Sequence, residues 1–333
     1  MKNVSRVVLS AALLLLTMPA AAMAQAQTMD EISLGGSGGA SALSAMSSGE
    51  ATLGDGTGTL NTAPTSGPEA VAFDGTYIWI ATQFNDQLTR IRVSDRSVAG
   101  SFTVGKRPVA LLYAASYVWV ANLLSNNVMK INPATGAVVG TFAAGDGPGG
   151  LAYDGTNIWV ANRNSNNVMK LRAKDGARLG TFAVGKRPIS LVSDGSSIWV
   201  TNNFSNSVTR LNSSGTVVGT YKVGKGPFGI AYDGQSIWVT NYFGKSLTRL
   251  RALDGFQLGT VTVGDGAAGI IFDGANLWVV NNGDNTLMKV SASGGTVLAT
   301  YSTGRGPFAV AFDGTRVWVP NFASNSVSTA PAG

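Results

Sequence analysis

Histidine and cysteine are both absent from this chain of 333 residues. Without them the chain can form no Ser-His-Asp or Cys-His catalytic group, no zinc site of the ordinary type and no disulfide. Charged residues are scarce, at 13% of the chain against about 25% in an average soluble domain, and only three of the 18 acidic residues are glutamate. The chain is instead rich in glycine, with 43 residues, and 44% hydrophobic, which together indicate a turn-rich all-β protein.

The first residues have the features of a secretory signal peptide. Lys2 and Arg6 precede a mostly apolar run over residues 7–18, and Ala22-Met23-Ala24 is a small-x-small cleavage pattern. The apolar run is short for a membrane span, and no cysteine follows it for lipid attachment. We therefore expect residues 1–24 to be removed, leaving a periplasmic or extracellular bacterial protein with no membrane span.

Residues 25–57 differ in composition from the rest of the chain. They are rich in Gly, Ser and Ala, with few aromatic or β-branched residues. Such a segment buries too little apolar surface to offset the entropy lost on ordering. We expect a flexible linker here, followed by one domain over residues 58–333.

The seven tryptophans reveal an internal repeat. They stand at positions 79, 119, 159, 199, 238, 278 and 318, with spacings of 40, 40, 40, 39, 40 and 40 residues. A fixed period of this length is typical of repeat architectures. In the third unit, four short strand patterns cover residues 149–153, 158–161, 168–172 and 179–184, with Asp-Gly turns at 154–155 and 175–176. Four antiparallel strands in about 40 residues match one blade of a β-propeller.

The ends of the repeat array indicate how the ring closes. The last unit stops after its third strand, near Ser328. Residues 58–63, Gly-Thr-Leu-Asn-Thr-Ala, match the fourth-strand pattern of residues 140–145, Gly-Thr-Phe-Ala-Ala-Gly. We therefore predict a seven-bladed β-propeller in which residues 58–63 supply the outer strand of the last blade. A closed ring leaves only short edges, so we expect a monomer.

The repeats also resemble a known family. The segments IWVANRNSNN, IWVTNNFSNS and LWVVNNGDNT look like the YVTN-type bacterial seven-bladed propellers and the repeats of streptogramin (virginiamycin B) lyases. The first two are followed by Gly-Thr-[Phe/Tyr] and the third by Ala-Thr-Tyr. The resemblance covers residues 58–333 and implies the propeller fold. It also implies an enzyme with a catalytic histidine, an acidic partner and a magnesium ion. The absence of histidine from this chain shifts the expected function from catalysis to binding.

Positions that recur in every unit are expected to build the framework. The tryptophans should pack between blades, and the Asp-Gly pairs should form turns, with Ala114-Ala115 replacing one pair in the second unit. The asparagines that follow the second strands should bond nearby backbone; they are Asn122, Asn162, Asn202, Asn241, Asn281 and Asn321. Function is then left to positions that differ between units.

These variable positions lie mainly in two sets of loops that share one face of a propeller. The loops from the fourth strand to the first hold basic residues, and those from the second strand to the third hold aromatic ones. Residues 58–333 contain 22 Lys and Arg against 14 Asp and Glu, a net charge of +8. We predict ligand binding on this face through Lys106, Arg107, Lys186, Arg187, Lys225 and Arg305, with Phe204, Tyr242, Phe243 and Phe322 as contact surface.

A basic ring with aromatic groups would suit several partners. A carboxylated glycan, a phosphorylated or other small anion and an acidic peptide all fit, whereas the export signal makes nucleic acid the least economical choice. An alternative interpretation of the same ring is a set of solvated loop tips. No cofactor is implied by any motif.

The leading hypothesis is therefore an exported, non-enzymatic propeller that binds an anionic ligand or a protein partner on its loop face. The alternative is a metal-dependent lyase or lactonase working through a carboxylate. Glu69, Asp265 and Asp284 are the weak candidates for a metal site in that case, because they lie on the expected loop face or at the channel end of a first strand.

Overall fold

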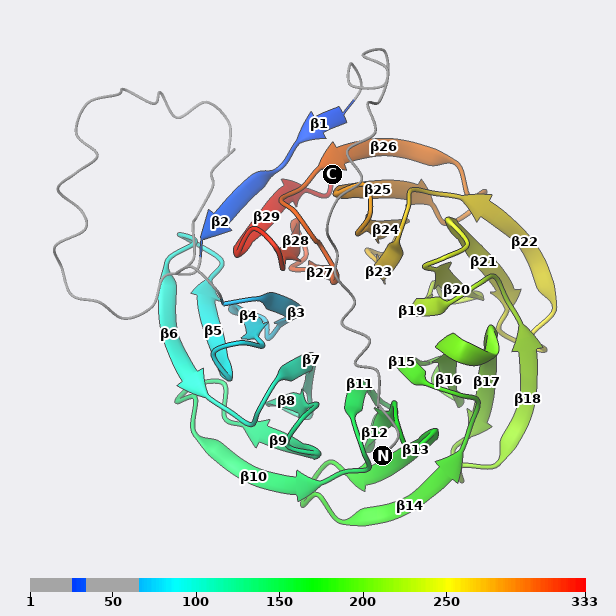
Figure 1. Cartoon of the computed structure of the whole chain (residues 1–333), viewed down its shortest axis with the longest axis horizontal. Coiled ribbons are helices and arrows are strands. Elements are labelled where there is room, and N and C mark those ends of the chain that lie inside the picture. The colour runs from blue at the N-terminus through cyan, green and yellow to red at the C-terminus, as the bar shows by residue number, and fades with distance from the viewer. Residues whose placement is uncertain (1–25, 34–65) are drawn as a thin grey trace, which may run out of the picture.

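The computed structural model describes residues 26–33 and 66–333 and shows a seven-bladed β-propeller (Figure 1). Each blade is an antiparallel sheet of four strands, and the first strand of each lies nearest the central axis. The predicted fold class is thus confirmed. Within the described residues, the helical content is one 3-10 turn, Asn203–Ser205, and no helix is long and apolar enough to cross a membrane.

The blades follow one another in sequence around the ring. Blade one contains β3 (Pro68–Phe73), β4 (Tyr77–Thr82), β5 (Gln87–Arg92) and β6 (Val98–Thr103). Blade two contains β7 (Pro108–Ala114), β8 (Tyr117–Asn122), β9 (Asn127–Ile131) and β10 (Val138–Ala143). Blade three contains β11 (Pro148–Tyr153), β12 (Asn157–Asn162), β13 (Asn167–Arg172) and β14 (Arg178–Ala183). Blade four contains β15 (Pro188–Ser193), β16 (Ser197–Asn202), β17 (Ser207–Asn212) and β18 (Val217–Lys222).

The second half of the ring repeats this order. Blade five contains β19 (Pro227–Tyr232), β20 (Ser236–Asn241), β21 (Ser246–Arg251) and β22 (Gln257–Thr262). Blade six contains β23 (Ala267–Phe272), β24 (Asn276–Asn281), β25 (Thr286–Ser291) and β26 (Val297–Ser302). Blade seven contains β27 (Ala311–Phe312), β28 (Arg316–Asn321) and β29 (Ser326–Pro331), with an outer strand from the beginning of the chain.

The ring is closed by residues 26–33. The strand β1 (Ala26–Thr28) pairs in parallel with β26 of blade six, and β2 (Asp30–Ser33) pairs in antiparallel fashion with β29 of blade seven. Between them, Met29 packs against the cluster that contains Trp278 and Ala330. One short segment therefore joins the outer edges of two neighbouring blades.

This closure differs in one respect from the sequence prediction. An N-terminal segment does complete blade seven, but in the structure that position on β29 is taken by Asp30–Ser33. The predicted strand, residues 58–63, lies outside the described residues. Residues 26–33 fall in the segment for which we expected a flexible linker, and they form strands because β26 and β29 offer unpaired backbone edges.

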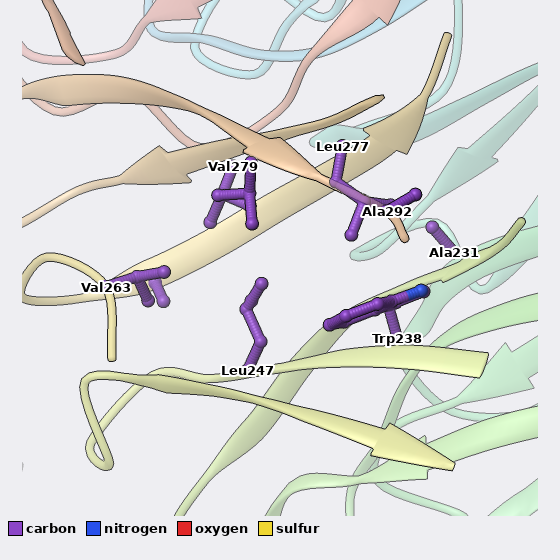
Figure 2. Packing of buried hydrophobic residues seen from close by; sticks show 9 residues of the cluster. Ala231, Trp238, Leu247, Val263, Leu277, Val279 and Ala292 are labelled. Carbon is purple, nitrogen blue, oxygen red and sulfur yellow. The ribbon is translucent and has the colours of Figure 1, made fainter. Parts of the chain in front are cut away.

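The hydrophobic core is divided among the interfaces between blades. All seven tryptophans are at most 1% exposed, and each belongs to a cluster with residues of the next blade. Figure 2 shows one example, in which Trp238 of β20 lies against Leu277 and Ala292 of blade six. Burying one indole removes roughly 150–250 Å², worth about 4–6 kcal/mol as an upper bound. The expected framework role of the tryptophans is therefore confirmed.

The Asp-Gly turns hold the tryptophans as well as the hairpins. In blade three, Asp154 Oδ1 accepts the backbone N–H of Thr156 and of Asn157, and Asp154 Oδ2 accepts Trp159 Nε1–H at 2.7 Å. In five other blades the tryptophan Nε1–H donates to the equivalent aspartate, which is Asp74, Asp194, Asp233, Asp273 or Asp313. In blade two, the Ala114 carbonyl accepts the Trp119 bond instead, at 3.2 Å.

Six basic residues on the third strands are also part of the framework. Each lies over a tryptophan ring, at 4.8–5.6 Å from its centroid, and donates hydrogen bonds to backbone carbonyls of the next blade. Lys130 Nζ, for example, donates to the carbonyls of Ala173 and Lys174 at 2.8 and 3.0 Å. The set comprises Arg90, Lys130, Lys170, Arg210, Arg249 and Lys289. These charges join blades together and are not available for a ligand.

Candidate functional site

The candidate site lies where two sets of loops meet around the central channel. These are the loops from second to third strands and from fourth to first strands, which we call the loop face. In blade two, for example, Leu123 N–H donates to the Arg107 carbonyl, and Leu124 N–H donates to the Lys106 carbonyl. The two sets of loops are therefore tied together within each blade.

Side-chain acceptors link neighbouring blades on this face at six of the seven junctions; the equivalent residue of blade five is Lys245. Asp86 Oδ1 accepts the backbone N–H of Arg107 at 2.7 Å, and Asn166 Oδ1 accepts that of Arg187 at 2.8 Å. Equivalent bonds come from Asn126, Asn206, Asn285 and Asn325. Asp86 therefore occupies a framework position.

The acidic residues of blade six have structural partners of their own. Asp284 Oδ2 accepts the backbone N–H of Asp265 at 2.7 Å, as Ser125 Oγ does for Lys106 in blade two. The Asp265 carboxylate pairs with Lys245 Nζ at 3.0 Å. Across residues 26–33 and 66–333, no three His, Cys, Asp or Glu side chains gather closely enough to hold a metal ion.

Two of the predicted arginines have a strained backbone. The fourth-to-first loop places one residue of every blade at a positive φ angle, and in five blades that residue is glycine. The exceptions are Arg107, with φ of 56°, and Arg187, with φ of 54°. A non-glycine residue in this region costs roughly 1–2 kcal/mol. Arginine is therefore kept at both positions at some expense in stability.

The side chains of these arginines reach neighbouring groups on the loop face. Arg107 Nε donates to Gln83 Oε1 at 2.6 Å, and the Arg187 guanidinium lies 4.5 Å from the centroid of the Phe204 ring. Both arginines remain exposed. Their charges are thus oriented but still open to a ligand.

A third arginine, Arg163, was not among the predicted site residues. It comes from the second-to-third loop of blade three and donates from Nη2 to the Gly149 carbonyl at 3.1 Å. A Cβ atom on Gly149 would lie 1.9 Å from Arg163 Nε, so only glycine admits this side chain. The corresponding residue in each of the other six blades is larger: Glu69, Val109, Ile189, Phe228, Ala268 and Phe308.

Glu69 projects from the innermost strand of blade one into the same region. Its Oε2 atom is buried and has no hydrogen-bond partner. Burial raises the pKa of Glu69 above its ordinary value, and the charges of Arg163 and Arg107 act in the opposite direction. Burial lowers the pKa of Arg163, which Glu69 opposes, while Arg187 and Arg107 lower it further. These four groups therefore interact electrostatically across the channel mouth.

Glu69 and Arg163 both line a central cavity of about 200 Å³. The rest of the lining is mostly apolar and comes from the first strands of blades one to six and from residues 308–310, just before β27 of blade seven. This volume is below the roughly 300–1,000 Å³ of sites for drug-sized ligands. The cavity therefore favours a small molecule.

Aromatic rings form a second group on the loop face, from blade five through blade seven to blade one. Phe228 lies 5.8 Å from Tyr242 and 6.3 Å from Phe308, between ring centroids. Phe308 continues to Phe322 at 6.1 Å, and Phe322 to Phe84 at 5.3 Å. We call these five residues the aromatic arc. Tyr242 and Phe322 were predicted. Phe228 lies on β19 and Phe308 just before β27, outside the second-to-third loops from which aromatic residues were predicted.

The other predicted residues are placed farther from this cavity lining. Lys106, Lys186, Lys225 and Arg305 are exposed in their loops. Phe204 and Phe243 are 62% and 65% exposed, and Phe204 lies with Arg187 and not in the aromatic arc. Of the predicted residues, Arg107 and Arg187 thus interact electrostatically with Arg163, whereas Tyr242 and Phe322 belong to the aromatic arc. Arg163 and Glu69 line the cavity itself.

Known structures share this architecture. A hydrazine synthase from Kuenenia stuttgartiensis superposes with a TM-score of 0.73 at 18% identity, over 84% of this chain and 99% of the other. A streptogramin B lyase gives 0.71 at 18% identity, over 81% and 95%. A catalytically inactive virginiamycin B lyase from Staphylococcus aureus with quinupristin gives 0.71 at 19%, over 81% and 97%.

No protein-family model matches this chain, and no curated protein matches it in sequence. At 18–19% identity the structural likeness establishes the propeller fold and nothing about activity. The expected likeness to streptogramin lyases is confirmed at the level of the fold. Function has to be argued from the site itself.

Proposed function

We propose that this protein is an exported, non-enzymatic propeller that binds a small anionic ligand with an apolar part at the mouth of its central channel. Arg107, Arg163 and Arg187 would attract the anion, and the aromatic arc would contact the apolar part. Export rests on the signal-peptide pattern, and intact mass of the mature protein should place its first residue at Gln25.

One observation carries this proposal. Arg107 and Arg187 occupy backbone positions that are glycine in the other five blades. Strained residues that the fold itself does not require are concentrated at functional sites. The charges of both arginines also lower the pKa of Arg163, which lines the cavity. Three cations in one region repel one another, and an anionic ligand would relieve that repulsion.

The test is calorimetric titration with 3-phenylpropanoate and its uncharged counterpart 3-phenylpropan-1-ol. We expect the carboxylate to bind more tightly, with an affinity that falls as salt is added. The double variant Arg107→Met with Arg187→Met should weaken carboxylate binding at least tenfold. Lys174→Met is the matched control, because Lys174 is an exposed cation on the turn between third and fourth strands, at the opposite face.

The proposal predicts different affinities for the acid and the alcohol, and for the original protein and the double variant. Equal affinity of the double variant and the original protein for 3-phenylpropanoate would refute an anion site at the loop face. So would equal affinity of the original protein for the acid and the alcohol.

A further inference from the structure

The cavity contains two opposite charges that do not neutralise each other directly. Glu69 comes from blade one and Arg163 from blade three, and both line the cavity. Glu69 makes no ion pair within 4.0 Å in the described part of the chain. Glu69 Oε2 and Arg163 Nε are both buried without a hydrogen-bond partner.

Such an arrangement is expensive in the absence of a ligand. A buried polar atom without a partner costs about 1–3 kcal/mol, and more when it carries a charge. A cation alone would meet Glu69 but would be repelled by Arg163 and Arg107. An anion alone would meet the arginines and leave Glu69 Oε2 unpartnered. A molecule with both charges satisfies each group.

The remainder of the cavity defines the rest of that molecule. Phe228 of blade five and Phe308 of blade seven, which adjoins blade one, also line it. Ile230 of β19 and Ile270 of β23 add apolar surface to the lining. With about 200 Å³ available, the ligand is small and has one apolar group.

We propose that the ligand is a free α-amino acid with an apolar side chain. Its carboxylate would bind Arg163 and Arg107, its ammonium group would donate to Glu69 Oε2, and its side chain would contact Phe228 and Phe308. This inference rests on the proposed function, because it places the anionic group at the same arginines. It adds the ammonium group and assigns Glu69 as the residue that selects it.

The experiment compares three ligands that differ by one charged group. L-phenylalanine carries both charges, 3-phenylpropanoate lacks the ammonium group and phenethylamine lacks the carboxylate. Each is titrated into the original protein, Glu69→Gln and Arg163→Met, with Ser190→Ala as a control for an uncharged residue of the cavity lining. Thermal unfolding of each variant verifies that it is folded.

The expected results separate the two charges. The original protein should bind L-phenylalanine at least tenfold more tightly than either analogue. Glu69→Gln should bind L-phenylalanine no better than 3-phenylpropanoate, while Arg163→Met should bind both carboxylates at least tenfold more weakly. If Arg163→Met does not fold, the double variant Glu69→Gln with Arg163→Met removes both buried charges together and should lose all discrimination among the three ligands.

The possible failures are distinguishable. If 3-phenylpropanoate binds as tightly as L-phenylalanine and Glu69→Gln changes neither affinity, the amino acid is wrong while the anion site stands. If phenethylamine binds best, Glu69 is the dominant group and both proposals are wrong. If none of the three ligands binds the original protein, both proposals are likewise overturned.

Discussion

The positive backbone φ angles of Arg107 and Arg187 permit a test. Replacing such an arginine with glycine should relieve backbone strain but weaken ligand binding. We consider Arg187, whose φ of 54° places it where five other blades have glycine. Arg187→Gly and Arg187→Ala both remove the guanidinium and its contact with the Phe204 ring. The two variants differ from each other only by one Cβ atom on a left-handed residue.

The magnitude follows from that difference. A Cβ atom in the left-handed region costs roughly 1–2 kcal/mol. Glycine has more conformational freedom in the unfolded chain, so ordering it costs about 0.5–1 kcal/mol more than ordering alanine. Arg187→Gly should therefore be more stable than Arg187→Ala by about 0.5–1 kcal/mol. For a domain of this size that corresponds to roughly 2 °C in Tm.

The assay is urea unfolding of the two variants beside a matched pair at the preceding residue. Lys186 lies in the same loop and is also exposed, but it is not among the residues with positive φ. There the order should reverse, with Lys186→Ala more stable than Lys186→Gly by about 0.5–1 kcal/mol. If Ala is as stable as Gly at position 187, or if both pairs show the same order, the strain argument is refuted.

Binding completes this test. Both variants at position 187 lack the guanidinium, so both should bind 3-phenylpropanoate equally weakly. A variant that gains stability over its alanine counterpart and still binds no better would show that arginine is retained there for the ligand. Restored binding in Arg187→Gly would contradict the assignment of Arg187 to the site.

Two further predictions concern ring closure and the buried carboxylate. Deleting residues 26–33 should lower the free energy of unfolding by roughly 2–4 kcal/mol, because β2 and β1 leave the backbone edges of β29 and β26 unpaired; an unchanged urea midpoint would contradict this role. Burial raises the pKa of Glu69, against the attraction of Arg163 and Arg107, so its ionisation above the ordinary value of 4.5 costs folded-state stability. The Tm of Glu69→Gln relative to the original protein should therefore increase between pH 4 and pH 8, and a constant difference would refute the assignment.

The fold could be predicted from the sequence because one interaction recurs in each blade. Each buried indole needs the same strand, turn and hydrogen-bond partner in every unit. The spacing of about 40 residues between tryptophans is therefore visible in the sequence. The Asp-Gly pairs were correctly interpreted as turns, but their bonds to tryptophan Nε1 were missed. A signal existed in the constant spacing of five residues between aspartate and tryptophan, as from Asp154 to Trp159.

Ring closure was less predictable because it happens only once. A strand that completes the last blade needs a backbone edge and only a few residues, so many short segments meet the requirement. The Gly-Thr pattern at residues 58–63 pointed to one of them, whereas β2 has no such pattern. What favours Asp30–Ser33 is the adjacent contact of Met29 with the interface between blades six and seven, which no repeat could reveal.

Charge was the least reliable sequence signal for the site. The net charge of +8 over residues 58–333 mildly favoured an anion-binding face. Six of the Lys and Arg residues, however, lie over tryptophans and donate to carbonyls of neighbouring blades. The acids Asp86 and Asp284 likewise accept backbone hydrogen bonds. Only the three-dimensional contacts of the side chains distinguish the cations that join blades from those that face the channel.

The site is built by departures from the repeat in two opposite senses. Arg107 and Arg187 stand where the backbone favours glycine, and Gly149 stands where most other blades have a larger side chain. The first exchange adds charge at a cost in backbone strain, and the second removes a side chain so that Arg163 can lie across the innermost strand. Within the described residues, only Arg107 of these three arginine side chains bonds a neighbouring blade, through Gln83. Because three such departures converge on the surroundings of one unpartnered glutamate, selection for a bound molecule explains them better than drift in a framework that is otherwise uniform.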